Sequence, residues 1–198
     1  MMKKISKIFC KTLFLFLLTF SFEVSGKILT EGNANAKVTV KVFSSLTCPA
    51  CANFHSEIYY ELKKEFIDAG LVKFEHHPFP LDLAALNAEV ILRCNTKDDR
   101  KFELLSKIYK KQNSWAVGSD INRINDSIKK IGSEFNMKDE IMNSCLKDEK
   151  TQDEILNQRI EAQKKYQIQS TPTIYINEKK YSGKVDYKQF KKVIEKNL

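Results

Sequence analysis

Two cysteines separated by two residues, Cys48-Pro49-Ala50-Cys51, stand where a predicted strand passes into a predicted helix. Residues 38–43 before them are mostly β-branched, and an amphipathic run extends from the second cysteine to Ile67. This order places the first thiol at a helix N-terminus, where unpaired backbone N–H groups and the helix dipole favour the thiolate. The motif therefore predicts thiol–disulfide exchange, with Cys48 as the nucleophile and Cys51 as the resolving thiol.

The first 26 residues have the pattern of a secretory signal. A lysine-rich start precedes an apolar run, Thr12–Phe22, and Val24-Ser25-Gly26 offers small residues for cleavage. The run is too short to cross a bilayer comfortably as a helix. We expect cleavage after Gly26, which leaves 27–198 without a membrane anchor, and an uncleaved anchor is the alternative.

The cysteine count supports the same interpretation. Of the five cysteines, Cys10 lies in the predicted signal, which leaves an even number in an exported chain. Such a number suits two disulfides, Cys48–Cys51 and, by elimination, Cys94–Cys145. A plain buried thiol at Cys94 is the alternative to the second bond.

Structural zinc is the main rival for a CxxC motif. Zinc normally takes four ligands, often from a second close pair of Cys or His. His55 could share a helix face with Cys51, but the sequence offers no second close pair. We therefore predict no metal and no cofactor.

The formal net charge of +8 does not indicate nucleic-acid binding. Lysine supplies 29 of the 33 basic residues, whereas arginine is the preferred group for bidentate recognition of bases and phosphates. The lysines are also interspersed with Asp and Glu along helical segments, as on solvated helix faces. We expect no nucleic-acid partner.

The order of predicted elements indicates an α/β thioredoxin fold with an inserted helical subdomain. After a short polar lead-in at 27–36, a strand at 38–43, a helix at 51–67 and a strand at 71–75 follow one another. The rest of the predicted elements are helices at 83–94, 102–109, 121–135, 141–146 and 152–166, a hairpin of 173–176 with 179–181, and a helix at 187–196. The domain is predicted to span 27–198, with its thioredoxin core at 37–80 and 151–198 and the insertion at 81–150.

The second motif is Ser170-Thr171-Pro172-Thr173, directly before the predicted hairpin. An X-Pro bond just before a strand is a place where a cis peptide can be built into a turn. A cis Pro172 would leave the backbone of Thr171 free to pair with an extended substrate peptide. Thr171 and Pro172 are therefore the predicted substrate-binding residues.

With these motifs in place, the chain resembles the periplasmic DsbA-like thiol:disulfide oxidoreductases, in particular their alphaproteobacterial branch. The similarity runs through Phe43–His55, Phe79–Asp82, Arg93-Cys94, Trp115, Cys145-Leu146 and Ser170–Asn177. It implies a periplasmic enzyme that donates its disulfide to newly exported proteins, either reduced or wrongly oxidised. It also implies reoxidation by a DsbB-like, quinone-linked membrane oxidase.

Two positions depart from the family's pattern. Strong oxidants of the family usually have His where this chain has Ala50, and that His helps to hold the nucleophile as thiolate. The family also commonly has a buried Glu at the position of Val42, near the second cysteine. Both departures indicate a less oxidising couple without affecting disulfide exchange itself.

Two alternatives to a disulfide-forming enzyme remain open. One is an isomerase or reductase of the same fold, which Ala50 and Thr171 permit. The other is a non-catalytic exported chaperone or peptide-binding module, against which the presence of both CxxC cysteines argues.

The remaining candidates are interpreted structurally. His76 and His77 are expected to flank a strand end as polar surface or capping groups. Trp115 is expected to anchor the core or a loop, and Phe66, Phe74 and Phe79 are expected in the core.

Overall fold

The computed structural model describes residues 28–94 and 100–198, so the predicted signal at 1–26 lies outside the described residues. Five strands form one sheet in the order β1-β3-β2-β4-β5. Their bounds are β1 Leu29–Gly32, β2 Val38–Ser44, β3 Val72–Pro78, β4 Thr173–Ile176 and β5 Lys179–Lys180. β2 and β3 are parallel, and every other neighbouring pair is antiparallel.

The two central strands show why this sequence forms a sheet covered on both faces. β-branched residues fit the pleated backbone, and successive side chains point to opposite faces. Val40 and Val42 point to one face, and in the parallel register they lie opposite Phe74 and His76 of β3. Phe43 points to the other face, where Ala162 and Ile168 pack around it in a smaller apolar cluster.

One continuous helical segment covers the first face. It comprises α1 (Pro49–Phe54), the π-helical turn η1 (His55–Tyr59), α2 (Tyr60–Leu62) and a second π-helical turn η2 (Lys63–Ile67). The segment is followed by Gly70, whose φ of +72° lies in the left-handed region that favours glycine at helix ends. The C-terminal helix α9 (Tyr187–Asn197) buries Phe190 and Ile194 in the same core cluster.

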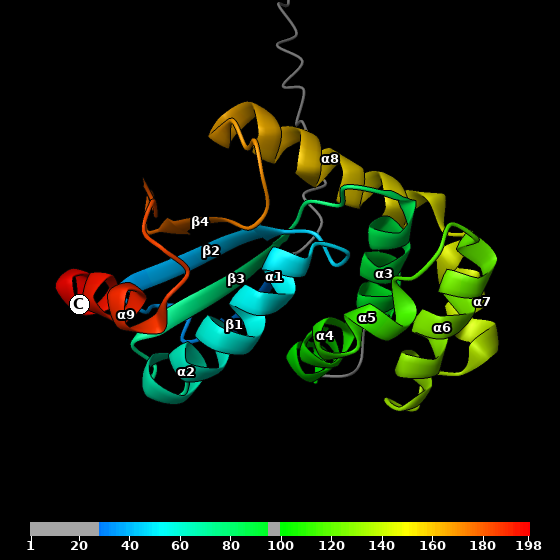
Figure 1. Ribbon diagram of the computed structural model, residues 1–198, viewed down its shortest axis with the longest axis horizontal. Coiled ribbons are helices and arrows are strands. Elements are labelled where there is room, and N and C mark those ends of the chain that lie inside the picture. The colour runs from blue at the N-terminus through cyan, green and yellow to red at the C-terminus, as the bar shows by residue number, and fades with distance from the viewer. Residues whose placement is uncertain (1–27, 95–99) are drawn as a thin grey trace, which may run out of the picture.

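The inserted helices lie together at one end of the sheet, and α8 runs from this group back toward β4 (Figure 1). The inserted helices are α3 (Leu83–Cys94), α4 (Lys101–Lys110), α5 (Gln112–Trp115), α6 (Ile121–Ser133) and α7 (Asp139–Leu146), and α8 spans Glu149–Tyr166. Close packing requires Gly132 on α6, where an added Cβ would lie 2.5 Å from the Met142 sulfur. Apolar residues of α3, α4 and α6 share a single core cluster with the sheet.

The predicted α/β thioredoxin fold with a helical insertion is confirmed, and three details were missed. Residues 27–36 were predicted to be a lead-in, yet β1 pairs with β3 within them. The second strand was predicted to end at Glu75, yet β3 extends to Pro78 because parallel pairing with β2 continues to Ser44. The short helix α5 was not predicted, although the expected burial of its Trp115 in the core is confirmed at 2% exposure.

Phe66, Phe74 and Phe79 are buried, as expected. None of the helices within 28–94 and 100–198 combines the length and the apolar composition that crossing a bilayer requires.

Candidate active site

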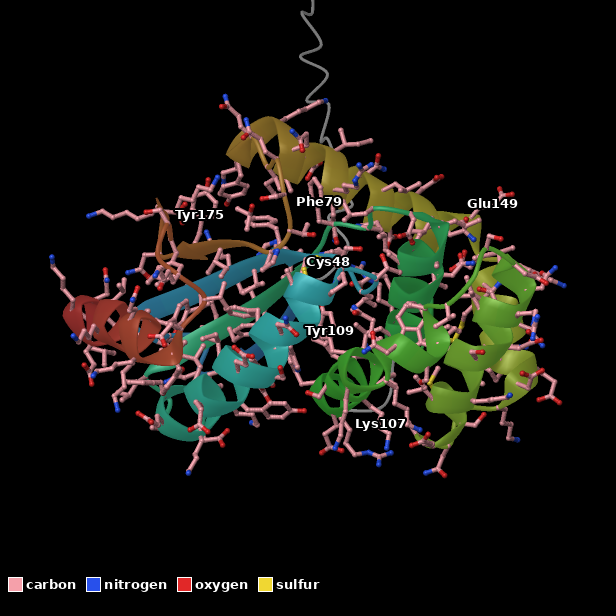
Figure 2. The ribbon with its side chains drawn as sticks, viewed as in Figure 1. Cys48, Phe79, Lys107, Tyr109, Glu149 and Tyr175 are labelled. Atoms are coloured by element: carbon pink, nitrogen blue, oxygen red, sulfur yellow. A yellow bond between two sulfur atoms is a disulfide. The ribbon has the colours of Figure 1, made fainter. Side chains whose placement is uncertain are left out.

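Cys48 lies at the start of α1, where the chain leaves β2 through a short turn (Figure 2). Its backbone is extended, with φ −80° and ψ 119°, and Pro49 occupies the first helical position. Proline suits this position because its missing N–H would be unpaired there anyway. The Cys48 carbonyl accepts from the N–H groups of Cys51 and Ala52 at 3.1 and 3.2 Å. The local sequence thus fixes a half-buried thiol at the helix N-terminus.

The environment of Cys48 favours its thiolate. Its pKa is lowered from 9.0 to about 5, chiefly by a hydrogen bond from the Cys51 thiol. Partial burial opposes this shift, while the Thr171 side chain and the backbone N–H groups of Cys51 and Ala50 add to it. A thiolate at neutral pH is both a ready nucleophile and a good leaving group.

Cys51 has the opposite environment. It is 2% exposed, and burial is the main cause that raises its pKa above 9.0, followed by its hydrogen bond to Cys48 and the Cys48 charge. Cys51 therefore stays a protonated thiol while Cys48 ionises. Two thiols with pKa values displaced in opposite directions can divide a disulfide exchange into an exposed and a shielded half.

Thr171 and Pro172 lie beside Cys48, although they are distant in the sequence. β4 pairs with β2 so that Thr173 lies opposite Phe43, and this register brings the preceding turn to the active-site end of β2. The Thr171–Pro172 peptide bond is cis. The Cys48 thiol lies 3.3 Å from the Thr171 carbonyl oxygen.

Gln112 of α5 ties the inserted helices to the active-site turn, a role that the sequence alone did not suggest. Its side-chain amide donates to the carbonyl oxygens of Leu46 and Cys48 at 2.8 and 3.0 Å. A buried amide on a short irregular helix leaves no periodic signal in the sequence. The insertion thereby holds the turn that carries the nucleophile.

The sequence matches the protein family described as Thioredoxin over residues 25–196. The chain belongs to the thioredoxin family. It is 32% identical over 176 residues to disulfide bond formation protein D of Bacillus subtilis (strain 168), an alignment that covers 84% of this chain and 75% of that protein. It is 29% identical over 163 residues to a Rickettsia bellii protein whose name describes a protein-disulfide oxidoreductase, and it spans 61% of that relative's length.

Solved structures agree with this placement in the thioredoxin family. Wolbachia pipientis alpha-DsbA1 superposes with a TM-score of 0.79 and 26% identity, covering 86% of this chain and 90% of that one. BdbD from Bacillus subtilis, in its oxidised form, gives a TM-score of 0.72 and 28% identity over 85% of this chain and 91% of its own. Within the thioredoxin family, the chain is a DsbA-like thiol:disulfide oxidoreductase.

Ala50 and Val42 lie at two different depths of this thioredoxin-family site. Ala50 is exposed in the first turn of α1, beside the nucleophile. Val42 is buried at 3% exposure and lies opposite His76 in the sheet. The buried β2 position is therefore apolar, with an imidazole as its neighbour on the adjacent strand.

The expectation for His76 and His77 is wrong. Both lie inside β3 and not beyond its end, because the strand pairs with β2 as far as Pro78. His76 is 3% exposed, and its Nε2 is 2.6 Å from Glu89 Oε1. His77 points to the opposite face, where its Nε2 is 2.9 Å from Glu75 Oε2 and its ring packs against Phe43. The two prolines after them suggested an earlier strand end than the ladder allows.

His55, the candidate for a zinc ligand, is held inside the protein. Its Nε2 is 2.8 Å from the Ser106 hydroxyl, and its ring stacks on Tyr59 at 4.2 Å between ring centres. Burial lowers its pKa from 6.5 to about 3. In the described parts of the chain, no group of three or more His, Cys, Asp and Glu side chains could hold a metal ion.

Cys94 and Cys145 are joined by a disulfide that links the end of α3 to α7, with their Cα atoms 5.8 Å apart. Cys48 and Cys51 are free thiols in this structure. The molecule therefore combines a bonded pair in the insertion with an unbonded pair at the active site.

Proposed function

We propose that this DsbA-like enzyme is exported to the periplasm and forms disulfides in exported proteins. Cys48 and Cys51 form its redox-active disulfide. A substrate thiolate attacks the Cys48 sulfur, the Cys48–Cys51 bond breaks, and Cys51 takes the electron pair and a proton. A second substrate thiolate then attacks the substrate sulfur of the mixed disulfide. The substrate disulfide forms, and Cys48 leaves as a thiolate.

The single observation that supports net oxidation of the substrate is the lowered pKa of Cys48, to about 5. A thiol with a low pKa is a good leaving group, and a stabilised thiolate favours the reduced enzyme over its disulfide. The enzyme then tends to pass its disulfide on to substrates. This supports net oxidation more than net reduction.

Thr171 and Pro172 are proposed to bind the substrate backbone next to the reacting sulfur. The Thr171 carbonyl oxygen lies 3.3 Å from the Cys48 thiol, which supports this role. A cleft of about 430 Å³ lies beside the first turn of α1 and is lined by Pro49, Ala52, Asn53 and Tyr109 among others. The Cys94–Cys145 bond is proposed to have a structural role.

Export by a signal at 1–26, with cleavage after Gly26, fits these substrates. Reoxidation by a DsbB-like, quinone-linked membrane oxidase would complete the cycle. N-terminal sequencing of the protein from a periplasmic fraction should give Lys27 as the first residue. Membranes that contain quinone and the partner should restore the Cys48–Cys51 disulfide of the reduced enzyme, whereas membranes without the partner should not.

The decisive experiment mixes the oxidised enzyme with an unfolded, reduced protein that has two cysteines. We expect one substrate disulfide per enzyme molecule, counted by the loss of thiols from the substrate after its separation from the enzyme, and no reaction with Cys48→Ser. Cys51→Ser, given the same substrate with its two cysteines already joined, should instead accumulate a mixed disulfide, because Cys48 opens the substrate bond and no Cys51 thiol is present to release it. An oxidised enzyme that leaves the substrate thiols intact, but reshuffles wrongly paired disulfides when reduced, would contradict the proposal and favour an isomerase. Binding of the substrate without any exchange would favour a chaperone.

A further inference from the structure

A histidine–glutamate pair is buried on the face of the sheet that carries the active-site helix. His76 of β3 and Glu89 of α3 are 3% and 1% exposed, and 2.6 Å separates Nε2 from Oε1. The other ring nitrogen of His76, Nδ1, is 3.2 Å from the hydroxyl of Ser44, the last residue of β2. Ser44, His76 and Glu89 thus form a buried hydrogen-bonded chain. Polar and charged groups are costly to bury even when they are paired, so we asked what this chain does.

Two buried polar atoms near this chain have no hydrogen-bond partner among the described residues. They are the second carboxyl oxygen of Glu89 and the hydroxyl of Tyr109 on α4. Tyr109 lies on the side of α1 that faces the inserted helices (Figure 2), and its ring centre is 5.0 Å from that of His55. The Tyr109 hydroxyl and the second Glu89 oxygen can each still form a hydrogen bond, so a proton can pass between groups that are not hydrogen-bonded to each other in this structure.

Tyr109 is within electrostatic reach of both the active site and the buried pair. Burial is the main cause that raises its pKa above 10, and the charges of Cys51, Glu89 and Cys48 add to the effect. Interaction with the Ser44 hydroxyl acts in the opposite direction. The charges of the two active-site cysteines and of Glu89 thus act on the same buried hydroxyl, which has no hydrogen-bond partner among the described residues.

Cys51 needs such a connection because it must exchange a proton at a site closed to water. When a substrate attacks Cys48, the Cys51 sulfur leaves as an anion that is 2% exposed. Burial disfavours that anion and favours its protonation. Val42, the buried β2 residue nearest to the pair in register, has no group that could supply a proton.

We propose that Tyr109, Ser44, His76 and Glu89 form a buried proton path that serves Cys51, with the His76–Glu89 pair as its store. The inference rests on the proposed roles of Cys48 and Cys51. When the enzyme oxidises a substrate, the pair gives up one proton and the Cys51 anion gains one. When Cys51 later attacks a mixed disulfide, its proton returns to the pair. Ser44, His76 and Glu89 act on Cys51 only through Tyr109.

Other ionisable groups lie on the elements that carry the pair, on helices packed against them and on the active-site segment. They are His77 on β3, Arg93 on α3, Tyr109 on α4, Arg159 on α8, Cys48 at the start of α1, Cys51 on α1 and His55 on η1. His55 and His77 each have a pKa lowered first by burial, and the charge of His76 contributes to both shifts. Arg93 donates to Gln158 at 2.7 Å, and Arg159 lies over the Phe79 ring.

The opposite face of the sheet supplies a matched control. His77 and Glu75 form a similar contact on the same strand at 2.9 Å, but they point away from the face that carries α1. Glu75→Gln removes one carboxylate from a histidine pair, as Glu89→Gln does, without touching the path. Tyr109→Phe removes only the proposed connecting hydroxyl and leaves the His76–Glu89 pair in place.

The test follows a single step in the reduced enzyme. Cys48 is converted to a mixed disulfide with 5-thio-2-nitrobenzoate, and Cys51 then attacks it and releases the coloured thiolate, recorded by stopped flow. We expect Glu89→Gln and Tyr109→Phe each to slow this release about a hundredfold at pH 7, the lower end of the range that assisted proton transfer contributes. Both variants should also show a steeper rise of the rate with pH, because hydroxide replaces the path. Glu75→Gln should match the wild type.

A second reaction separates this effect from a general loss of structure. In a Cys51→Ser background, an external thiol should remove the same group from Cys48 at equal rates with and without Glu89→Gln or Tyr109→Phe. Wild-type rates and pH profiles for both variants would overturn the path, and so would an equal slowing by Glu75→Gln. If Glu89→Gln does not fold, Tyr109→Phe decides alone. Failure of the wild-type enzyme to release the thiolate would contradict the proposed function instead.

Discussion

Cys48 and Thr171 are 123 positions apart in the chain, yet the Cys48 thiol lies 3.3 Å from the Thr171 carbonyl oxygen. The antiparallel register of β4 against β2 produces this approach, because Thr173 is paired with Phe43. The nucleophile and the residue proposed to hold the substrate backbone are thus set by one strand pairing, and helix α8 with the inserted helices lies between them in sequence.

Alkylation of the reduced protein should label Cys48 first, with half-maximal reactivity near pH 5. The reason is that the pKa of Cys48 is lowered to about 5, so the thiolate is lost only as the pH falls through that value. Peptide mapping after brief treatment with iodoacetamide at several pH values gives both the site and the midpoint. In the unfolded protein the midpoint should return to that of an ordinary thiol, about pH 8.5. Faster labelling of Cys51 would reverse the assignment.

Ala50→His should make the Cys48–Cys51 couple more oxidising. Ala50 is exposed beside the nucleophile, so an imidazole there can stabilise the thiolate of the reduced form without disturbing the core. A change on the order of 30 mV corresponds to about 1.4 kcal/mol for this two-electron exchange. Equilibration with glutathione measures the potential, and Ala50→Gln controls for side-chain size. An unchanged or more negative potential would disprove this account of Ala50.

The double substitution Cys94→Ser with Cys145→Ser should lower the free energy of unfolding by about 4 kcal/mol, the loop-entropy value for a closure of 51 residues. Denaturant unfolding of both proteins with Cys48 and Cys51 reduced gives the difference. Disulfide exchange with a substrate should remain largely intact, because the bond joins α3 to α7 away from the active-site turn. A large loss of exchange in a folded double variant would show that the bond also serves the site.

Stability should fall as the pH drops from about 6.5 toward 3, in part because of His55. Its pKa is about 3 in the folded protein and near 6.5 in the unfolded chain. The unfolded state therefore binds a proton that the folded state rejects, and the stabilisation present above pH 6.5 is lost on acidification. Each pH unit is worth about 1.4 kcal/mol. His55→Gln keeps a partner for Ser106 and should flatten this acid limb.

Urea unfolding at pH 7.5, 5.5 and 4.5 measures the effect. The gap between the wild type and His55→Gln should be constant above pH 7 and should change below it in favour of the variant. Parallel losses of stability in both proteins would assign the acid limb to other groups.

Sequence reasoning predicted the parts of the fold that local pattern determines. The strand–CxxC–helix order and the repeated apolar spacing of 83–94 and 121–135 were sufficient for the thioredoxin fold and its insertion. β1 was missed because four residues with alternating half-buried side chains resemble a polar lead-in until β3 is present to pair with them. Pairing between distant segments leaves little trace in a short stretch.

In the active site, too, the residues marked by local sequence pattern were predicted and those that depend on distant partners were missed. Cys48 and Cys51 were found because their spacing carries the chemistry. The burial of His76 was missed because it depends on two distant elements, β2 beside it and Glu89 above it on α3. Gln112 was missed for a related reason, since its partners are backbone carbonyls that have no side-chain signature.

The last strand of the sheet has a consequence for the protein in a crowded compartment. β5 consists only of Lys179 and Lys180, and both are exposed. A strand of two residues with two positive charges offers few free backbone groups and repels a second copy of the same edge. In the proposed function, this edge would give an unfolded substrate chain few backbone groups to pair with and so would limit aggregation through β5.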